Sequence, residues 1–109
     1  MMNIVDTLQE YGAIGKDNAM PTDELLRLCG IHSRRYLVQV VADERAAGAL
    51  ICSKATGRGG YYLPSCDEEI IAQKKALESR IIKHALALRP FRRRVKEIKK
   101  AVKGGKGNE

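Results

Sequence analysis

Apolar positions in the first half of the chain recur every three or four residues, the spacing of one face of an α-helix. The first run predicts a helix over about residues 3–11, ended by Gly12. The second run predicts a helix that opens at Pro21-Thr22, where Thr22 can cap the amino end, and that stops at Gly30. The apolar positions of the two runs are Ile4, Val5, Leu8, Tyr11, Leu25, Leu26 and Cys29.

A third helix is predicted to restart shortly after Gly30, with Ser33 as its N-cap and Gly48 at its end. Glu44 falls inside the apolar stripe of this helix. We therefore expect either a bend near the end of the helix, or a pairing of Glu44 with a basic residue at the edge of the stripe. The residues predicted to face the core are Leu37, Val40, Val41 and Ala47.

The spacing then changes to that of a β-hairpin. Residues 49–52 predict a strand, 54–60 a loop and 61–63 a returning strand. Three of the five residues from 56 to 60 are glycine, as expected at the tip of a hairpin. Residues 18–20, at the end of the connector between the first two helices, are predicted as a very short strand.

A long helix is predicted for the C-terminal part of the chain. Ser65 and Glu68 have the spacing of a capping box, which marks its start. Eight positions then alternate steps of four and three residues, as the inner positions of a coiled coil do, and we call them the ladder. The ladder consists of Leu77, Ile81, His84, Leu88, Phe91, Val95, Ile98 and Val102.

Pro90 interrupts the predicted helix. Proline lacks an amide hydrogen and its ring clashes with the carbonyl group of the preceding turn. We therefore expect a kink, or a break into two helices over residues 66–88 and 91–103. Residues 104–109 are predicted to form a disordered tail.

Together these elements predict a mainly α fold with a small β-hairpin and a long C-terminal helix. Over residues 20–64 their order resembles the winged helix-turn-helix domains of small prokaryotic and phage DNA-binding proteins. The segments that carry the resemblance are 22–26, 29–35, 44–51 and 59–64. We therefore predict a winged helix-turn-helix domain over residues 1–64, a C-terminal helical segment for dimerisation and basic contacts over 65–103, and a tail over 104–109.

The net charge of the chain is concentrated in its C-terminal fifth. The formal net charge is +7. Residues 1–88 contain eleven basic and eleven acidic residues, whereas residues 89–109 contain nine basic residues against Glu97 and Glu109. This asymmetry points to a polyanion, either nucleic acid or an anionic membrane. The membrane is disfavoured because Phe91 is the only aromatic anchor in this segment. The alternative is a solvated helix face with no such partner.

The side of the third helix opposite its apolar stripe suits a DNA major groove, which is wide enough for one α-helix. Arg35 can pair with guanine and Gln39 with adenine. Val38 or Ala42 can touch a thymine methyl group, and both are small enough to allow close approach. The alternative is that the arginines of this helix are ordinary surface charges on a protein-binding module.

Other residues are predicted to contact phosphates. Ser33 and Arg34 lie at the amino end of the third helix, which favours an anion. The winged-helix resemblance implies that residues of the hairpin loop reach a phosphate or the minor groove, and this assigns Lys54 and Arg58 to DNA. Basic residues of the last helix can neutralise further phosphates, and those assigned are Arg92, Arg93 and Arg94.

The ladder can pair with the same ladder of a second chain, or it can fold back over the chain's own core. We favour a homodimer, since its two-fold symmetry matches that of a palindromic DNA site. His84 could make the pairing depend on pH or serve as a hydrogen-bonded interface residue. The residues assigned to the dimer are Leu77, Ile81, His84, Leu88, Phe91, Val95 and Ile98.

The sequence offers little for catalysis or for cofactors. Cys29, Cys52 and Cys66 are scattered, which favours free thiols in a reducing compartment, and Cys29 with His32 lacks a second pair at zinc spacing. Phosphate-binding loops and hydrolase motifs are missing. We expect no enzyme activity, metal, cofactor or small-molecule ligand. Without an apolar span or a secretory signal, a cytoplasmic location is expected.

We thus expect a homodimer that binds double-stranded DNA sequence-selectively, in transcriptional control or in phage or plasmid replication or packaging. Two alternatives stay open. One is a winged-helix scaffold whose tail binds another protein, and the other is a non-specific nucleic-acid or RNA binder driven by the basic tail.

Overall fold

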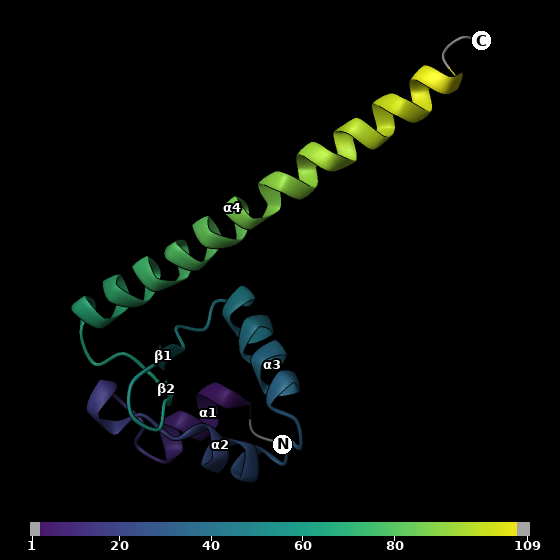
Figure 1. Cartoon of the computed structure of the whole chain (residues 1–109). Helices are drawn as coiled ribbons and strands as arrows, with labels where there is room; N and C mark the ends of the chain where they lie inside the picture. Colours follow the sequence, from purple (N-terminus) through teal and green to yellow (C-terminus); the bar gives the residue numbers. More distant parts are fainter. Residues whose placement is uncertain (1–2, 107–109) are drawn as a thin grey trace. The chain divides into compact units, whose positions relative to one another are not determined.

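The computed structural model describes the backbone of residues 3–106 and the side chains of residues 3–102. In this range the chain is mainly helical, with a two-stranded antiparallel hairpin and a long C-terminal helix, as predicted (Figure 1). The elements are α1 (Ile4–Glu10), the 3-10 helix η1 (Lys16–Asn18), α2 (Thr22–Cys29), α3 (Arg34–Ala46), β1 (Cys52–Lys54), β2 (Gly60–Tyr62) and α4 (Asp67–Lys106).

The chain divides into two compact units, and the boundary lies inside α4, between Lys74 and Lys75. The first turns of α4 belong to the first unit because their side chains bond to its loops and hairpin. The Oε1 atom of Gln73 accepts a hydrogen bond from the backbone amide of Ser53 at 2.9 Å. The sequence placed this boundary at Pro64, before α4, because periodicity does not show which turns of a long helix are packed.

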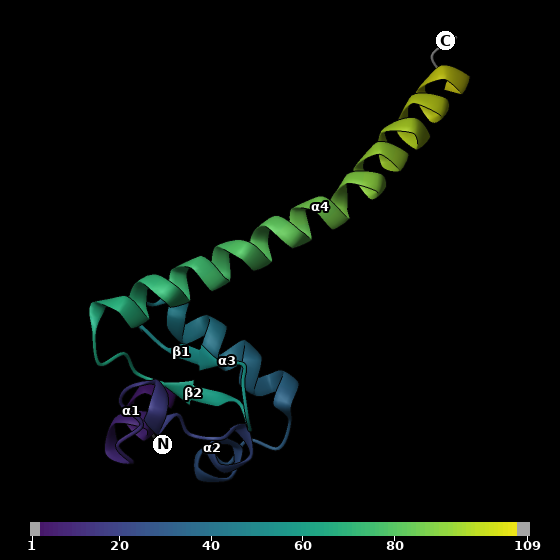
Figure 2. The same cartoon turned by 60° about the vertical axis from the view of Figure 1, so that its left-hand side comes forward.

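The core of the first unit is built from all three short helices and the hairpin region. Leu8, Leu25 and Leu37, one from each of α1, α2 and α3, are completely buried. Burial of such a side chain contributes about 1.5–3 kcal/mol. Figure 2 shows the paired strands with these helices gathered around them. The buried cluster consists of Ile4, Leu8, Ala13, Met20, Leu25, Cys29, Leu37, Val41 and Ile51.

The carboxylate of Glu44 connects α3 to the amino end of α1. Its Oε2 atom accepts a hydrogen bond from the amide of Ile4 at 2.8 Å, and Oε1 accepts one from the amide of Val5 at 3.2 Å. These amides have no acceptor within α1, and the helix dipole favours a negative charge beside them. Glu44 therefore lies in the apolar stripe for a reason that spacing could not show. Neither of the two predicted alternatives, a bend or a basic partner, included this contact with the amino end of α1.

The hairpin starts later than predicted. Cys52 pairs with Tyr62, Ser53 with Tyr61 and Lys54 with Gly60, whereas the first strand was predicted over residues 49–52. Residues 49–51 form neither helix nor strand, and the amide of Ala49 donates to the carbonyl of Glu44, near the end of α3, at 2.9 Å. Ala47, which was predicted to face the core, is exposed.

Gly60 lets the returning strand approach the connector before α2. Its φ is +117°, and a Cβ atom at this position would lie 2.0 Å from the carbonyl oxygen of Met20. The close approach allows Met20 and Tyr61 to exchange two backbone hydrogen bonds, of 2.8 and 3.0 Å. The short strand predicted over residues 18–20 is thus reduced to a bridge at Met20.

The capping predictions had mixed outcomes. The hydroxyl of Ser33 accepts from the amide of Tyr36 at 3.2 Å, so Ser33 caps α3 as predicted. Gly30 ends α2 in the left-handed conformation, also as predicted. Thr22 was the wrong cap, since Pro21 holds the N-cap position and makes no side-chain bond.

The predicted Ser65–Glu68 capping box was also wrong, because the next glutamate in the chain takes that role. The Oε1 atom of Glu69 accepts from the amide and the hydroxyl of Ser65, at 2.8 and 3.0 Å. Its Oε2 atom accepts from the amide of Lys16 at 2.8 Å. Glu69 therefore ties the start of α4 to the connector between α1 and α2.

α4 runs through Pro90 without interruption to Lys106, so a break into two helices was wrong. Proline removes one helical hydrogen bond, to the carbonyl of Leu86. Leu86 is 49% exposed, and water can bond to a carbonyl group on such a surface, which lowers the cost of the missing bond. Residues 104–106 are helical, contrary to the predicted disordered tail, and residues 107–109 lie outside the described range.

We expect Glu44→Ala to lower the free energy of unfolding by about 1–3 kcal/mol, the usual loss for charged hydrogen bonds in a partly buried place. Urea denaturation measures this change. Glu10→Ala, at the exposed end of α1, is the matched control and should change stability by less than about 0.5 kcal/mol. Equal effects of the two substitutions would refute the role assigned to Glu44.

We expect Glu69 to make stability depend on pH in the acid range. The backbone amides of Ser65 and Lys16 lower the pKa of its carboxyl from the ordinary value of 4.5. Its contribution to the free energy of unfolding is therefore fully present above pH 4.5. It is lost as the pH falls through the lower pKa that the carboxyl has in the folded state. Urea denaturation across this range should show a shallower acid decline for Glu69→Gln than for the native chain. Parallel declines would contradict the assignment.

Candidate nucleic-acid interface

The orientation of α3 about its own axis is set by its buried side chains. Leu37 is 0% exposed and Val41 is 1% exposed, so the opposite side of the helix faces outward. The residues predicted for base contacts lie there, and each is exposed in the described chain: Arg35, Val38, Gln39 and Ala42.

Arg35 is the most available of the polar groups on this face. The described residues offer its guanidinium no hydrogen-bond or ion-pair partner, and it is exposed. Val38, one turn onward, is 58% exposed. The exposed guanidinium of Arg35 and the small apolar side chain of Val38 thus share the outward side of α3.

Gln39 has a partner that sequence reasoning missed. Its Nε2 atom donates a hydrogen bond to Oδ1 of Asp43 at 2.9 Å. The amide retains its carbonyl oxygen and one further N–H for a ligand. The two residues are four apart on one helix, a spacing at which side chains meet, so the pair was visible in the sequence.

Arg34 is also engaged, since its guanidinium forms an ion pair with Asp23 in the first turn of α2. The two side chains are 67% and 66% exposed, and exposed pairs of this kind are worth less than about 1 kcal/mol. A phosphate could compete with Asp23 for Arg34. Spacing could not reveal this contact, because the two residues belong to different helices.

The two hairpin residues assigned to DNA differ in their surroundings. Lys54 is the last residue of β1, pairs with Gly60 and is half-buried. Arg58 lies in the loop between the strands and is exposed. The loop is closed by a hydrogen bond of 3.0 Å from the amide of Gly59 to the carbonyl of Thr56. Arg58 is therefore the better placed of the two to contact a polyanion.

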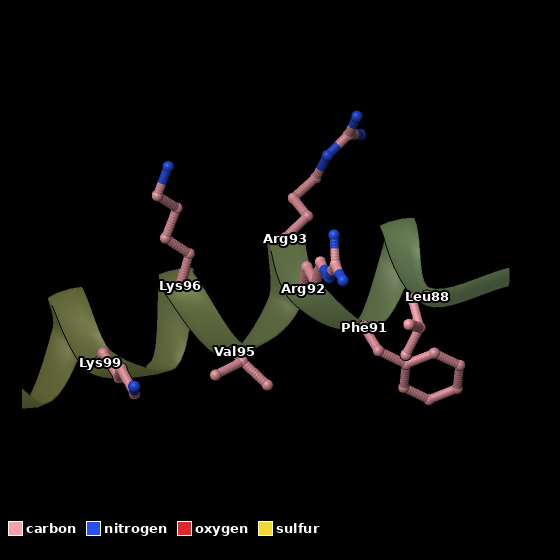
Figure 3. A pocket seen from close by; sticks show the side chains of 7 residues that line it. All are labelled: Leu88, Phe91, Arg92, Arg93, Val95, Lys96 and Lys99. Carbon is pink, nitrogen blue, oxygen red and sulfur yellow. The ribbon is translucent and has the colours of Figure 1, made fainter. Parts of the chain in front are cut away.

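The basic residues of α4 belong to the second unit. Arg92 and Arg93 are exposed, and Arg94 forms an ion pair of 3.2 Å with Glu97 on the same helix. Figure 3 shows Arg93 and Lys96 pointing away from the side that carries the apolar residues Leu88, Phe91 and Val95.

The ladder side of α4 is open within the described chain. Ile81 is 65% exposed, Phe91 69% and Val95 48%, and His84 is exposed as well. Leu77 alone is half-buried.

Two of the three thiols are buried in the first unit. Cys29 and Cys52 are buried, and Cys66 is exposed. Burial, with the Glu69 carboxylate adding in the same direction, raises the pKa of the Cys52 thiol, which disfavours the reactive thiolate. Among the described residues, no cluster of His, Cys, Asp or Glu could hold a metal ion.

Comparison with known proteins gives no relative: the chain matches no protein-family model, no curated protein and no solved structure. In the described range, none of the helices combines the length and the apolar character that a membrane span needs.

Proposed function

We propose that the chain binds double-stranded DNA sequence-selectively, with α3 in the major groove, in the manner of a winged helix-turn-helix protein. The observation that carries the proposal is the outward face of α3, where the guanidinium of Arg35 is exposed, has no partner among the described residues and lies one turn from Val38. A helix that enters a groove needs a polar reading group and room for close approach. The outward face of α3 offers both.

The connection from α2 to α3 supports the same proposal. α2 ends at Cys29 and α3 begins at Arg34, and Gly30 makes the tight turn between them with a φ of +65°. A short glycine-containing turn between two helices is typical of the helix-turn-helix motif. The hairpin that follows α3 takes the place of the wing, with Arg58 in its loop.

The charge distribution gives α3 and α4 different roles in the proposed DNA binding. α3 carries acidic residues as well as arginines, so α3 alone would attract a phosphate backbone weakly. The basic residues of α4 supply the sequence-independent attraction, and Arg35 with Gln39 supplies selectivity. Such a protein fits transcriptional control, or phage or plasmid replication or packaging, without enzyme activity of its own.

Two other functions remain to be separated by experiment. A scaffold protein would bind no duplex even at low salt. A non-specific nucleic-acid binder would lose all binding on deletion of residues 89–109 and would be indifferent to substitutions on α3. Selection of bound sequences from a pool of random duplexes provides the probe for both.

We expect Arg35→Ala to weaken binding to the selected duplex about 5- to 150-fold, the effect of losing a contact worth about 1–3 kcal/mol. It should also relax the preference at one base pair. The control is Arg27→Ala on α2, which removes the same charge from a side chain that is 70% exposed. Fluorescence anisotropy measures both. Equal losses for the two variants would contradict base contact by Arg35.

We expect the triple substitution of Arg92, Arg93 and Arg94 to alanine to weaken binding similarly to all duplexes. Each lost phosphate contact should reduce the slope of log affinity against log salt by about 0.9. Titrations at several salt concentrations measure the slope. An unchanged slope would rule out phosphate contacts by these arginines, and an altered sequence preference would assign them to base recognition.

A further inference from the structure

The ladder of α4 presents an apolar surface that the described residues leave open. Its members on both sides of Pro90 are large and solvent-exposed, among them Ile98 at 47% and Val102 at 59%. The ladder extends from Leu77 to Val102, which spans about 38 Å along a helix. An apolar stripe of this length favours a long apolar partner of matching spacing.

We propose that a second copy of this chain covers the ladder in an antiparallel orientation, with the two-fold axis between Arg89 and Pro90. The steps between ladder positions are four, three, four, three, four, three and four residues, and this order is the same in both directions. A reversed copy therefore brings every ladder residue opposite another ladder residue. The layers pair Leu77 with Val102, Ile81 with Ile98, His84 with Val95, and Leu88 with Phe91 of the second copy.

Charges that flank the ladder favour this orientation. In antiparallel pairs, the residues on each flank of the apolar seam face one another across the interface. The reversed register places Glu78 opposite Lys99 of the second copy, which is attractive. The remaining flanking arginines then face alanines, and the pairs are Arg80 with Ala101, Ala85 with Arg92, and Ala87 with Arg94.

The parallel orientation is less favourable on the same residues. It places Arg94 beside Lys99 of the second copy and His84 opposite His84. It also aligns two copies of residues 89–109, each with a net charge of +7. The antiparallel pair instead sets the basic half of one helix along residues 76–88 of the other, which hold only Arg80 and Lys83 against Glu78. Repulsion along the helices is therefore smaller in the antiparallel pair.

The first test is the oligomeric state of the full chain, measured by sedimentation equilibrium. The native chain should be a dimer. Ile81→Glu should raise the dimer dissociation constant at least about 100-fold, because two unpaired carboxylates would be buried in each dimer. Ile82→Glu is the matched control: Ile82 is 60% exposed, against 65% for Ile81, but lies outside the ladder. It should leave the dimer intact. A monomeric native chain, or equal effects of the two variants, would overturn the proposal.

The second test fixes the orientation by disulfide formation in a Cys66→Ser background, in which the remaining cysteines are buried. In the antiparallel pair, two cysteines at position 81 are about 26 Å apart along the helix, far beyond disulfide reach. Ile81→Cys alone should therefore stay uncrosslinked, and a mixture of Ile81→Cys with Ile98→Cys should form the mixed dimer. Efficient crosslinking of Ile81→Cys to itself would establish the parallel pair and overturn the proposal. Neither test uses DNA, so its outcome is independent of the proposed function.

Discussion

The orientation of α3 about its axis is the constraint on which the rest of the structure depends. Leu37 and Val41 hold one side of the helix in the core, and Glu44 fixes its far end to the first amides of α1. A rotation of α3 that made Arg35 less exposed would have to withdraw Leu37 from the core. It would also separate the carboxylate of Glu44 from the first amides of α1. The outward position of Arg35 thus follows from the packing of the opposite side.

Acidic side chains bind two of the polar groups on the surface that this orientation of α3 exposes. Asp23 holds Arg34 and Asp43 holds Gln39, whereas Arg35 has no such partner among the described residues. Of these three side chains, two are thus engaged by acidic residues of the described chain and one is not. In the proposed function, the basic residues of α4 would supply the attraction to the DNA backbone and α3 would supply the discrimination between sequences.

Much of the fold could be predicted because it rests on local rules. Ser33 and Gly30 bound their helices as predicted, since a hydroxyl cap and a left-handed glycine act within a few residues. The errors share a different cause. Glu44 was misjudged because its partners lie forty residues away, at the amino end of α1. The predicted break at Pro90 did not occur. Leu86, whose carbonyl loses its helical partner there, is 49% exposed, which the sequence does not reveal.

The residues of the candidate interface divide in the same way, into those that local rules predict and those whose contacts join distant parts of the chain. The exposed positions of α3 follow from periodicity alone, so Arg35, Val38 and Ala42 were found without coordinates. The ion pair of Arg34 with Asp23 joins two helices and required the structure. The start of the hairpin was also missed, because hydrogen bonds at the end of α3 occupy residues that look suited to a strand.

Amide chemical shifts measured by NMR during titration with the selected duplex test most directly whether the outward face of α3 binds DNA. We predict that the largest changes in chemical shift cluster at residues 34–42, with a second group around Arg58. Changes confined to residues 89–102, with α3 unaffected at saturation, would contradict it.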